Sequence, residues 1–360
     1  MDSTTSLFFE LIKISLKNKS ELEHLPSEKQ WEMLYELGCK QSLTGVLLYG
    51  IERLPVTQRP PQELLLKWIG IQQIVVSINK VQDGRSKELY EWFKKQGYNS
   101  CIIKGQGVAR LYPQPELRQA GDIDIWVNAD RDDIVGKMLT ESIGVSVIDY
   151  VNCHVAFFDD VEVEVHFRPS YFFNPFANKR LQKWIQGKKS VQMTSFDDAV
   201  GFCYPTISFN LVFSLIHIYR HVFSEGIGLR QLMDYYYILK HSTEAERKEA
   251  FDTLCSLGLK RFVATVMHVM RRVFNIDTSL LLCQPNQNEG DYLLAEILRG
   301  GNFGRYDDRN KNLPSENRMK RGVENVKRNL RFLKHYPSEV MWSPAFKFWH
   351  WCWRKWKGYL

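Results

Sequence analysis

The sequence predicts an α+β fold in which a small mixed β-sheet lies between helical segments at the two ends of the chain. Two changes in the spacing of apolar residues support this prediction. Apolar residues recur at helical spacing over residues 1–97 and again over 196–360, whereas over 98–195 they form short runs and strict alternations typical of strands. The 360-residue chain is therefore expected to divide into an N-terminal helical region, a central sheet domain and a C-terminal helical region.

The elements of the helical regions follow from the same spacing. Apolar positions predict helices around 7–14 and 31–37, and a longer helix that begins after Pro60-Pro61 and breaks near Asp83-Gly84. In the central region, alternation predicts strands at 100–103, 122–127 and 161–167, and helical spacing predicts a helix over 131–143.

Composition excludes several classes of protein. A hydrophobic content of 44% with 25% charged residues argues against disorder and against collagen-like or disulfide-rich scaffolds. The seven cysteines form no Cys-x-x-Cys pair, so we expect free thiols in a reducing compartment. No basic segment precedes the first apolar residues, and we expect a cytoplasmic protein. Residues 199–219 lack Asp, Glu, Lys and Arg, but their polar side chains favour a buried helix over a membrane span.

Two carboxylates stand two positions apart in the strand predicted at 122–127. Because side chains alternate across a strand, Asp122 and Asp124 leave the same face, about 7 Å apart at the backbone. Such a pair can hold Mg²⁺ ions for in-line phosphoryl or nucleotidyl transfer. Glu162 and Glu164 share one face of the later strand, and a neighbouring placement would bring one of them to the pair as a third carboxylate. Two amphipathic strands with polar outer faces explain the alternation equally well.

A glycine-containing turn follows the first predicted strand. The segment Lys104-Gly105-Gln106-Gly107 stands at a strand-to-helix junction, where backbone N–H groups can approach a triphosphate and the lysine adds a positive charge. The segment is neither a Walker loop nor a Gly-x-Gly-x-x-Gly motif, and an ordinary turn is the alternative interpretation.

The order of these motifs resembles the polymerase-beta-type nucleotidyltransferase superfamily and, more narrowly, the uncharacterised nucleotidyltransferase family of bacteria. The resemblance rests on Lys104-Gly105, Arg118, Gly121-Asp122-Ile123-Asp124 and Glu164-Val165-His166 in this order. It continues through four later segments, which are 217–221, 228–234, 301–304 and 331–339.

The resemblance implies a nucleotidyltransferase core that transfers a nucleoside monophosphate from a nucleoside triphosphate (such as ATP) to an acceptor hydroxyl. It implies Mg²⁺, with Mn²⁺ as the alternative ion, held by Asp122, Asp124 and Glu164, which would also be the catalytic residues. The residues expected to contact the nucleotide are Lys104, Gly105, Gln106, Gly107, Arg118 and Arg230. A small molecule, a glycan, a protein or a tRNA could each serve as acceptor. Because Gln106 stands where the family pattern has Ser or Gly, a non-catalytic nucleotide-binding or partner-docking module is the alternative.

Two helical pairs in the C-terminal region have open interpretations. His217 and His221 are four residues apart, a spacing that suits zinc, but packing against the catalytic cleft is the favoured interpretation. Arg230 and Asp234 have the same spacing and fit either a surface ion pair or a phosphate contact in which Asp234 orients Arg230.

The net charge of +7 is concentrated at the C-terminal end. Residues 301–360 hold 14 basic and 5 acidic side chains. A basic helix is predicted over 319–334, with Met319, Val323, Val326, Leu330 and Leu333 on its apolar face. Five of the ten tryptophans follow, at Trp342, Trp349, Trp351, Trp353 and Trp356. The stretch 318–360 fits three roles, which are closure of the protein's own core, peripheral contact with an anionic membrane, and a nucleic-acid platform.

Overall fold

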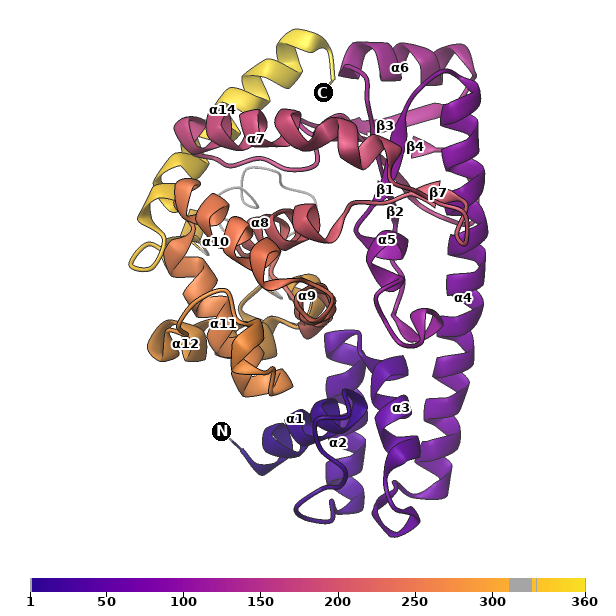
Figure 1. Cartoon of the computed structure of the whole chain (residues 1–360), viewed down its shortest axis with the longest axis vertical. Helices are drawn as coiled ribbons and strands as arrows, with labels where there is room; N and C mark the ends of the chain where they lie inside the picture. The colour runs from indigo at the N-terminus through magenta and orange to yellow at the C-terminus, as the bar shows by residue number, and fades with distance from the viewer. Residues whose placement is uncertain (1, 311–325, 328, 360) are drawn as a thin grey trace.

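The computed structural model describes residues 2–310, 326–327 and 329–359 and has a five-stranded mixed sheet in a mostly helical chain (Figure 1). The strands are β1 (Ser100–Ile103), β2 (Ile123–Val127), β3 (Gly144–Ile148), β4 (Asn152–Ala156) and β5 (Val163–His166). Their order in the sheet is β1-β2-β5-β4-β3. β2 and β5 are parallel, and the other neighbouring pairs are antiparallel. The predicted α+β fold with a small mixed sheet is confirmed.

The N-terminal region is helical, as predicted, but its longest helix is continuous. The helices are α1 (Ser3–Ser15), α2 (Glu28–Gln41), α3 (Thr44–Arg53) and α4 (Gln62–Lys95). The break expected near Asp83-Gly84 is wrong. Tertiary contacts outweigh the weak helix propensity of glycine, because Asn79 and Gln82 on α4 donate side-chain hydrogen bonds to the carbonyl oxygens of Arg118 and Gly121. These bonds fix the loop before β2 against α4.

The central region also contains three helices, α5 (Gly105–Ala109), α6 (Arg131–Thr140) and α7 (Pro175–Thr194). The C-terminal region begins differently from the prediction. A two-stranded hairpin, β6 (Phe196–Asp197) with β7 (Phe202–Cys203), precedes its first helix, so helical structure does not start at 196. The later helices are α8 (Ile207–Ser224), α9 (Leu229–Lys240), α10 (Glu244–Ser256), α11 (Lys260–Phe274), α12 (Gln287–Gly300) and α14 (Pro337–Lys357). Short 3₁₀ helices lie at Val56–Gln58, Pro115–Leu117, Thr278–Leu280, Asn302–Gly304 and Asp308–Asn310.

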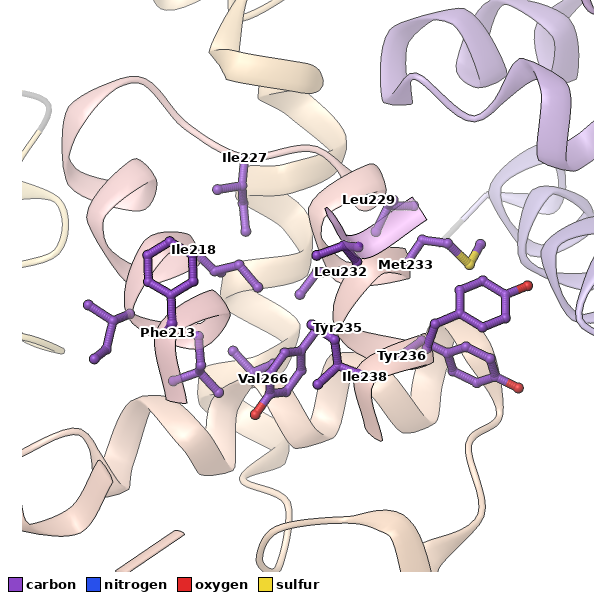
Figure 2. Close-up of a cluster of buried hydrophobic side chains, with 14 of the residues drawn as sticks. Phe213, Ile218, Ile227, Leu229, Leu232, Met233, Tyr235, Tyr236, Ile238 and Val266 are labelled. Atoms are coloured by element: carbon purple, nitrogen blue, oxygen red, sulfur yellow. The ribbon is translucent and has the colours of Figure 1, made fainter. Parts of the chain in front are cut away.

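The core of the C-terminal region holds α8 and α9 together. Figure 2 shows Phe213 and Ile218 of α8, Leu232 and Tyr235 of α9, and Val266 of α11 in one buried cluster. The uncharged stretch predicted as a buried helix is confirmed from Ile207 onward, since most of α8 is inaccessible to solvent. Among the described helices, α4 alone is long and apolar enough to cross a membrane by length and composition. With one side in this cluster, α8 and α9 can direct their other side chains toward the sheet.

Half of the basic helix predicted over 319–334, namely 319–325 and 328, lies outside the described residues. In the described part, the predicted apolar face is wrong. Leu330 and Leu333 are exposed, whereas Phe332 is 4% exposed and contacts Phe223 of α8 and Tyr292 of α12. The chain forms a turn at 331–335, so helical spacing does not decide which side chains are buried there.

Gly107 lies where α5 crosses β1, and it provides a test of this packing. A Cβ atom at Gly107 would lie 2.5 Å from the carbonyl oxygen of Ile102 and 3.1 Å from Cβ of Tyr204. We expect Gly107→Ala to lower the free energy of unfolding by about 1–3 kcal/mol in urea denaturation, because the backbone must move. The matched control is Gly84→Ala on the exposed side of α4, where a Cβ meets nothing within 4 Å and should stabilise the helix by up to about 1 kcal/mol. Equal effects of the two substitutions would contradict this packing.

Candidate active site

The pairing of β2 with β5 brings carboxylates from two distant parts of the chain together. The parallel register places Asp124 opposite Glu164, and the Ile123 amide donates to the Glu162 carbonyl oxygen at 2.9 Å. The side chain of Asp124 is 4% exposed, so it does not lie on a solvated outer face. It lies beneath α8 and α9, in a cavity between these helices and the sheet.

The cavity has a volume of about 540 Å³ and two kinds of charge on its walls. Its lining carboxylates are Asp122, Asp124, Glu162, Glu164, Glu225 and Asp234, and its lining cations are Lys104, Arg118, Arg230 and Arg305. His217 and His221 of α8 also face it, with ring centroids 4.3 Å apart. A cavity with both kinds of charge suits a cation together with an anionic ligand.

Asp124 lies at the centre of the polar contacts. One of its carboxylate oxygens is 2.6 Å from Lys104 Nζ and 2.7 Å from His166 Nε2. A carboxylate oxygen of Glu164 is 3.4 Å from the same imidazole nitrogen, and Asn152 Nδ2 donates a hydrogen bond to this carboxylate. Asp124, Glu164 and His166 each offer one ligand atom, and these atoms lie within 4.8 Å of one another, so the three residues could hold a metal ion.

Electrostatic repulsion acts between the carboxylates. The charge of Asp124, followed by burial and the charge of Glu164, raises the pKa of Asp122 to about 6. Burial also raises the pKa of Glu164, but the contacts with His166 and Lys104 outweigh it and hold that pKa below its usual range. A cation near Asp122 would relieve the repulsion that the existing contacts leave.

The turn after β1 contributes two of its four residues to the cavity. Lys104 has φ of 57°, an uncommon value for a side-chain-bearing residue, and it lines the cavity with Gly105, whose φ is 29°. Gln106 instead donates to Asp83 Oδ1 of α4 at 2.7 Å. Gly107 packs against β1, as described above. The structure therefore places Lys104 and Gly105 in the cavity, and Gln106 and Gly107 outside its lining.

The two predicted arginines line the cavity and have different partners. Arg118 forms a two-pronged ion pair with Asp234, Nε to Oδ1 at 2.7 Å and Nη2 to Oδ2 at 2.8 Å, and Tyr112 donates to the same carboxylate. Arg230 Nη1 donates to the Gln119 carbonyl oxygen at 2.7 Å. The suggested ion pair of Arg230 with Asp234 on a helix surface is thus wrong, because Asp234 is already paired across the fold.

The guanidinium of Arg230 donates to a backbone carbonyl oxygen rather than to a carboxylate, so this contact does not neutralise its positive charge. Burial, together with the charge of Arg118, lowers the pKa of Arg230 to about 10. Its Nε and the Nη1 of Arg118 are buried without a hydrogen-bond partner in the described structure. Two guanidinium groups with spare donors at one wall are suited to binding an anion such as phosphate.

Phe303 and Arg305 line the cavity without having been assigned a role from the sequence. Phe303 has φ of 54°, which is rare for an aromatic residue. Its ring centroid is 5.4 Å from that of His221 and 5.6 Å from the guanidinium carbon of Arg230. Gly304 fixes the turn in place, because its φ is 65° and a Cβ there would overlap the Glu225 carbonyl oxygen. The sequence Gly301-Asn302-Phe303-Gly304 predicts a turn, but it does not predict that this turn packs against the cavity.

Comparison with known proteins identifies the family of this chain. Residues 27–275, more than half of the chain, match the family described as Uncharacterised nucleotidyltransferase. The chain belongs to this family. The match covers all the proposed metal-binding and nucleotide-binding residues of this nucleotidyltransferase family member, whereas Phe303 and Arg305 lie beyond it.

Similarity to characterised proteins is limited. No curated protein matches the sequence. An antigenic nucleotidyltransferase-like protein from Paracoccidioides brasiliensis has a crystal structure that aligns with 57% of this chain and 94% of its own, with 13% identity and a TM-score of 0.36.

The Arg118–Asp234 pair is expected to be important for stability. Arg118 is 5% and Asp234 14% exposed, so Asp234→Asn leaves a buried guanidinium without its counter-charge. We expect a loss of about 3–5 kcal/mol in the free energy of unfolding, measured by denaturant titration. The control is Glu141→Gln in the exposed Lys137–Glu141 pair, where we expect less than about 0.5 kcal/mol. A loss no larger than that of the control would show that the buried pair is dispensable.

Proposed function

We propose that this family member is a Mg²⁺-dependent nucleotidyltransferase that transfers a nucleoside monophosphate from a nucleoside triphosphate to an acceptor hydroxyl. The observation that supports it best is the position of Asp124 opposite Glu164, in a cavity with Asp122 on one side and two buried arginines on another. Structural ion pairs alone would not require spare guanidinium donors at the same cavity.

The residues present fit a divalent cation. Asp122, Asp124 and Glu164 supply the carboxylate oxygens that Mg²⁺ prefers. The raised pKa of Asp122 reflects repulsion from Asp124, which a bound cation would reduce. His166 adds a nitrogen ligand, which Mn²⁺ accepts more readily than Mg²⁺. When bound, such an ion would neutralise charge that develops at the α-phosphate and on the departing pyrophosphate.

The chain's own groups would then bind and orient the reactants. Arg118 and Arg230 would hold phosphate oxygens, with Asp234 keeping the guanidinium plane of Arg118 fixed. A carboxylate oxygen of Glu164 would take the proton of the acceptor hydroxyl. The acceptor oxygen then bonds to the α-phosphorus, the bond from that phosphorus to the α–β bridging oxygen breaks, and pyrophosphate leaves.

One contact favours the alternative, a non-catalytic binding module. Lys104 Nζ lies 2.6 Å from Asp124, and an ammonium group there already compensates the carboxylate. Under our proposal this ammonium would instead contact a phosphate oxygen, and Asp124 would be available to hold a metal ion. Under the alternative it stays on Asp124, and nucleotide binds without metal or turnover.

Removing a metal-binding carboxylate tests the proposal directly. We expect Asp124→Asn to reduce Mg²⁺-dependent nucleotide binding in calorimetry, and to reduce pyrophosphate release with cell extract as acceptor source by at least about a hundredfold. Asp160→Asn on the exposed surface, where the residue pairs with Arg85, is the matched control. Unchanged binding and turnover in Asp124→Asn would exclude the proposed site, and binding without turnover in the parent would favour the non-catalytic module.

Substitution can show whether Glu164 of β5 or Glu162, just before this strand, is the third carboxylate of the metal site. Glu164 lies opposite Asp124 and touches His166, whereas Glu162 precedes the strand and is exposed. We expect Glu164→Gln to weaken Mn²⁺ binding at least about tenfold, and Glu162→Gln to change it less than about threefold. Electron paramagnetic resonance of the Mn²⁺ ion measures the binding. The reverse order would assign Glu162 as the third carboxylate.

We propose that Phe303 stacks on the base of the nucleotide. Its ring lines the cavity between His221 and Arg230, and a positive φ is retained there despite its cost. We expect Phe303→Gly to raise KM for the nucleoside triphosphate about tenfold or more through lost stacking. Because glycine relieves the backbone strain, thermal denaturation should show stability within about 1 kcal/mol of the parent. Phe303→Trp should retain KM, and an unchanged KM in Phe303→Gly would remove Phe303 from the nucleotide site.

A further inference from the structure

One side of α14 exposes an unusual number of large apolar side chains. Met341 is 70%, Phe348 68% and Trp356 80% exposed, and Trp349 and Trp351 are about half exposed. At 100° per residue, Met341, Ala345, Phe348, Cys352 and Trp356 follow one line along the helix, with tryptophans on both sides of it. These side chains, together with Trp342, are called here the aromatic face of α14.

The opposite side of α14 is fixed to the protein. Glu339 is buried, accepts a hydrogen bond from the Phe173 amide at 2.7 Å and lies 3.3 Å from Arg220. Phe346 stacks on Tyr171, and the guanidinium of Arg131 lies 4.3 Å from the Trp353 ring. The aromatic face therefore points outward because the other side of the helix is already packed, and closure of the protein's own core does not account for its exposed rings.

The start of α7 extends this face. Phe176 is 68% exposed, and its ring centroid is 6.2 Å from that of Trp342 (α7 and α14 lie together in Figure 1). The two helices are strongly basic. Their cations are Lys179, Arg180, Lys183, Lys188, Lys189, Lys347, Arg354, Lys355 and Lys357, and their one carboxylate is the buried Glu339.

We propose that the aromatic face of α14, with the start of α7, binds the surface of an anionic lipid bilayer. Tryptophan and phenylalanine on an exposed helix face enter the boundary between headgroups and acyl chains, and neighbouring Lys and Arg meet anionic headgroups. Lys188 pairs with Glu249 and Lys357 with Asp132, which leaves seven further cations on the two helices against one buried carboxylate. Charge complementarity selects this occupant, because an apolar partner would not need these cations.

Two observations favour a bilayer over single-stranded nucleic acid. Phe348 lies nearly parallel to Trp351 and Trp349 to Trp353, with interplanar angles of 27° and 19°, so these rings form a continuous apolar surface rather than separate platforms for bases. Met341 and Phe176 add apolar area with no group that reads a base or a phosphate. The exposed apolar residues of α4 do not have the same charge pattern, since that helix holds six cations and four carboxylates.

The test uses the full chain and sedimentation with two kinds of vesicle, one of phosphatidylcholine and one of phosphatidylcholine and phosphatidylserine in equal parts. We expect binding to the phosphatidylserine vesicles that weakens with added salt, and much weaker binding to phosphatidylcholine alone. The substitutions Phe348→Ser, Trp351→Ser and Trp356→Ser, made together, should reduce vesicle binding about tenfold or more.

Two controls make the result specific. Leu66→Ser, Ile74→Ser and Ile78→Ser remove three exposed apolar residues of α4, on the other side of the molecule from α14 in Figure 1, and should leave binding unchanged. Lys179→Glu with Lys183→Glu should remove the preference for phosphatidylserine while the aromatic residues remain. Thermal denaturation checks that each variant is folded.

Several outcomes would overturn the proposal. These are absence of vesicle binding by the parent, equal binding by the triple serine variant of α14, or an equal loss in the α4 control. Binding of single-stranded RNA without vesicle binding would assign the face to nucleic acid. A dimer of the parent that the α14 variant loses, again without vesicle binding, would assign it to a second copy of the chain.

Discussion

The structure of the site depends on one buried charge, the carboxylate of Asp124. Burying an unpaired carboxylate costs several kcal/mol, so its neighbours must compensate it. Lys104 does so from the turn after β1, and His166 does so from β5. Both partners are placed by the sheet, because β1 and β5 are the two strands that flank β2. The strand order that gives the sheet its core thus also determines which groups reach the centre of the cavity.

The second buried ion pair joins the helical region to this sheet. Arg118 comes from the loop before β2, and Asp234 comes from α9, whose other side lies in the apolar cluster with α8 (Figure 2). Asn79 of α4 binds the carbonyl oxygen of the same Arg118. One residue therefore connects α4 and α9 to the segment that carries Asp122 and Asp124.

Local pattern was enough to predict β1, β2 and β5, because alternation is a property of adjacent residues, but β3 and β4 were not predicted. Asp122 and Asp124, and Glu162 and Glu164 as alternatives, could be singled out in this way, whereas the choice of Glu164 rested on the family resemblance. The roles of Gln106 and Asp234 could not be predicted. Their partners, Asp83 and Arg118, are 23 and 116 residues away. The positions of Phe303 and Arg305 likewise depend on how a distant turn packs against α8 and α9. The interactions that complete the cavity are tertiary, and spacing along the chain carries no information on them.

Charge has to be assigned to surfaces rather than to chain segments. The excess of 14 basic over 5 acidic residues in 301–360 includes Arg309, which pairs with Glu296 and Asp307, and so adds little to an exposed field. α7 belongs to the central region, yet its five cations and no carboxylates lie beside α14. The basic surface is thus built from two segments that lie 166 residues apart in the chain, at Phe176 and Trp342. Their side-by-side packing joins them into one surface, which is the surface that we propose binds anionic lipid.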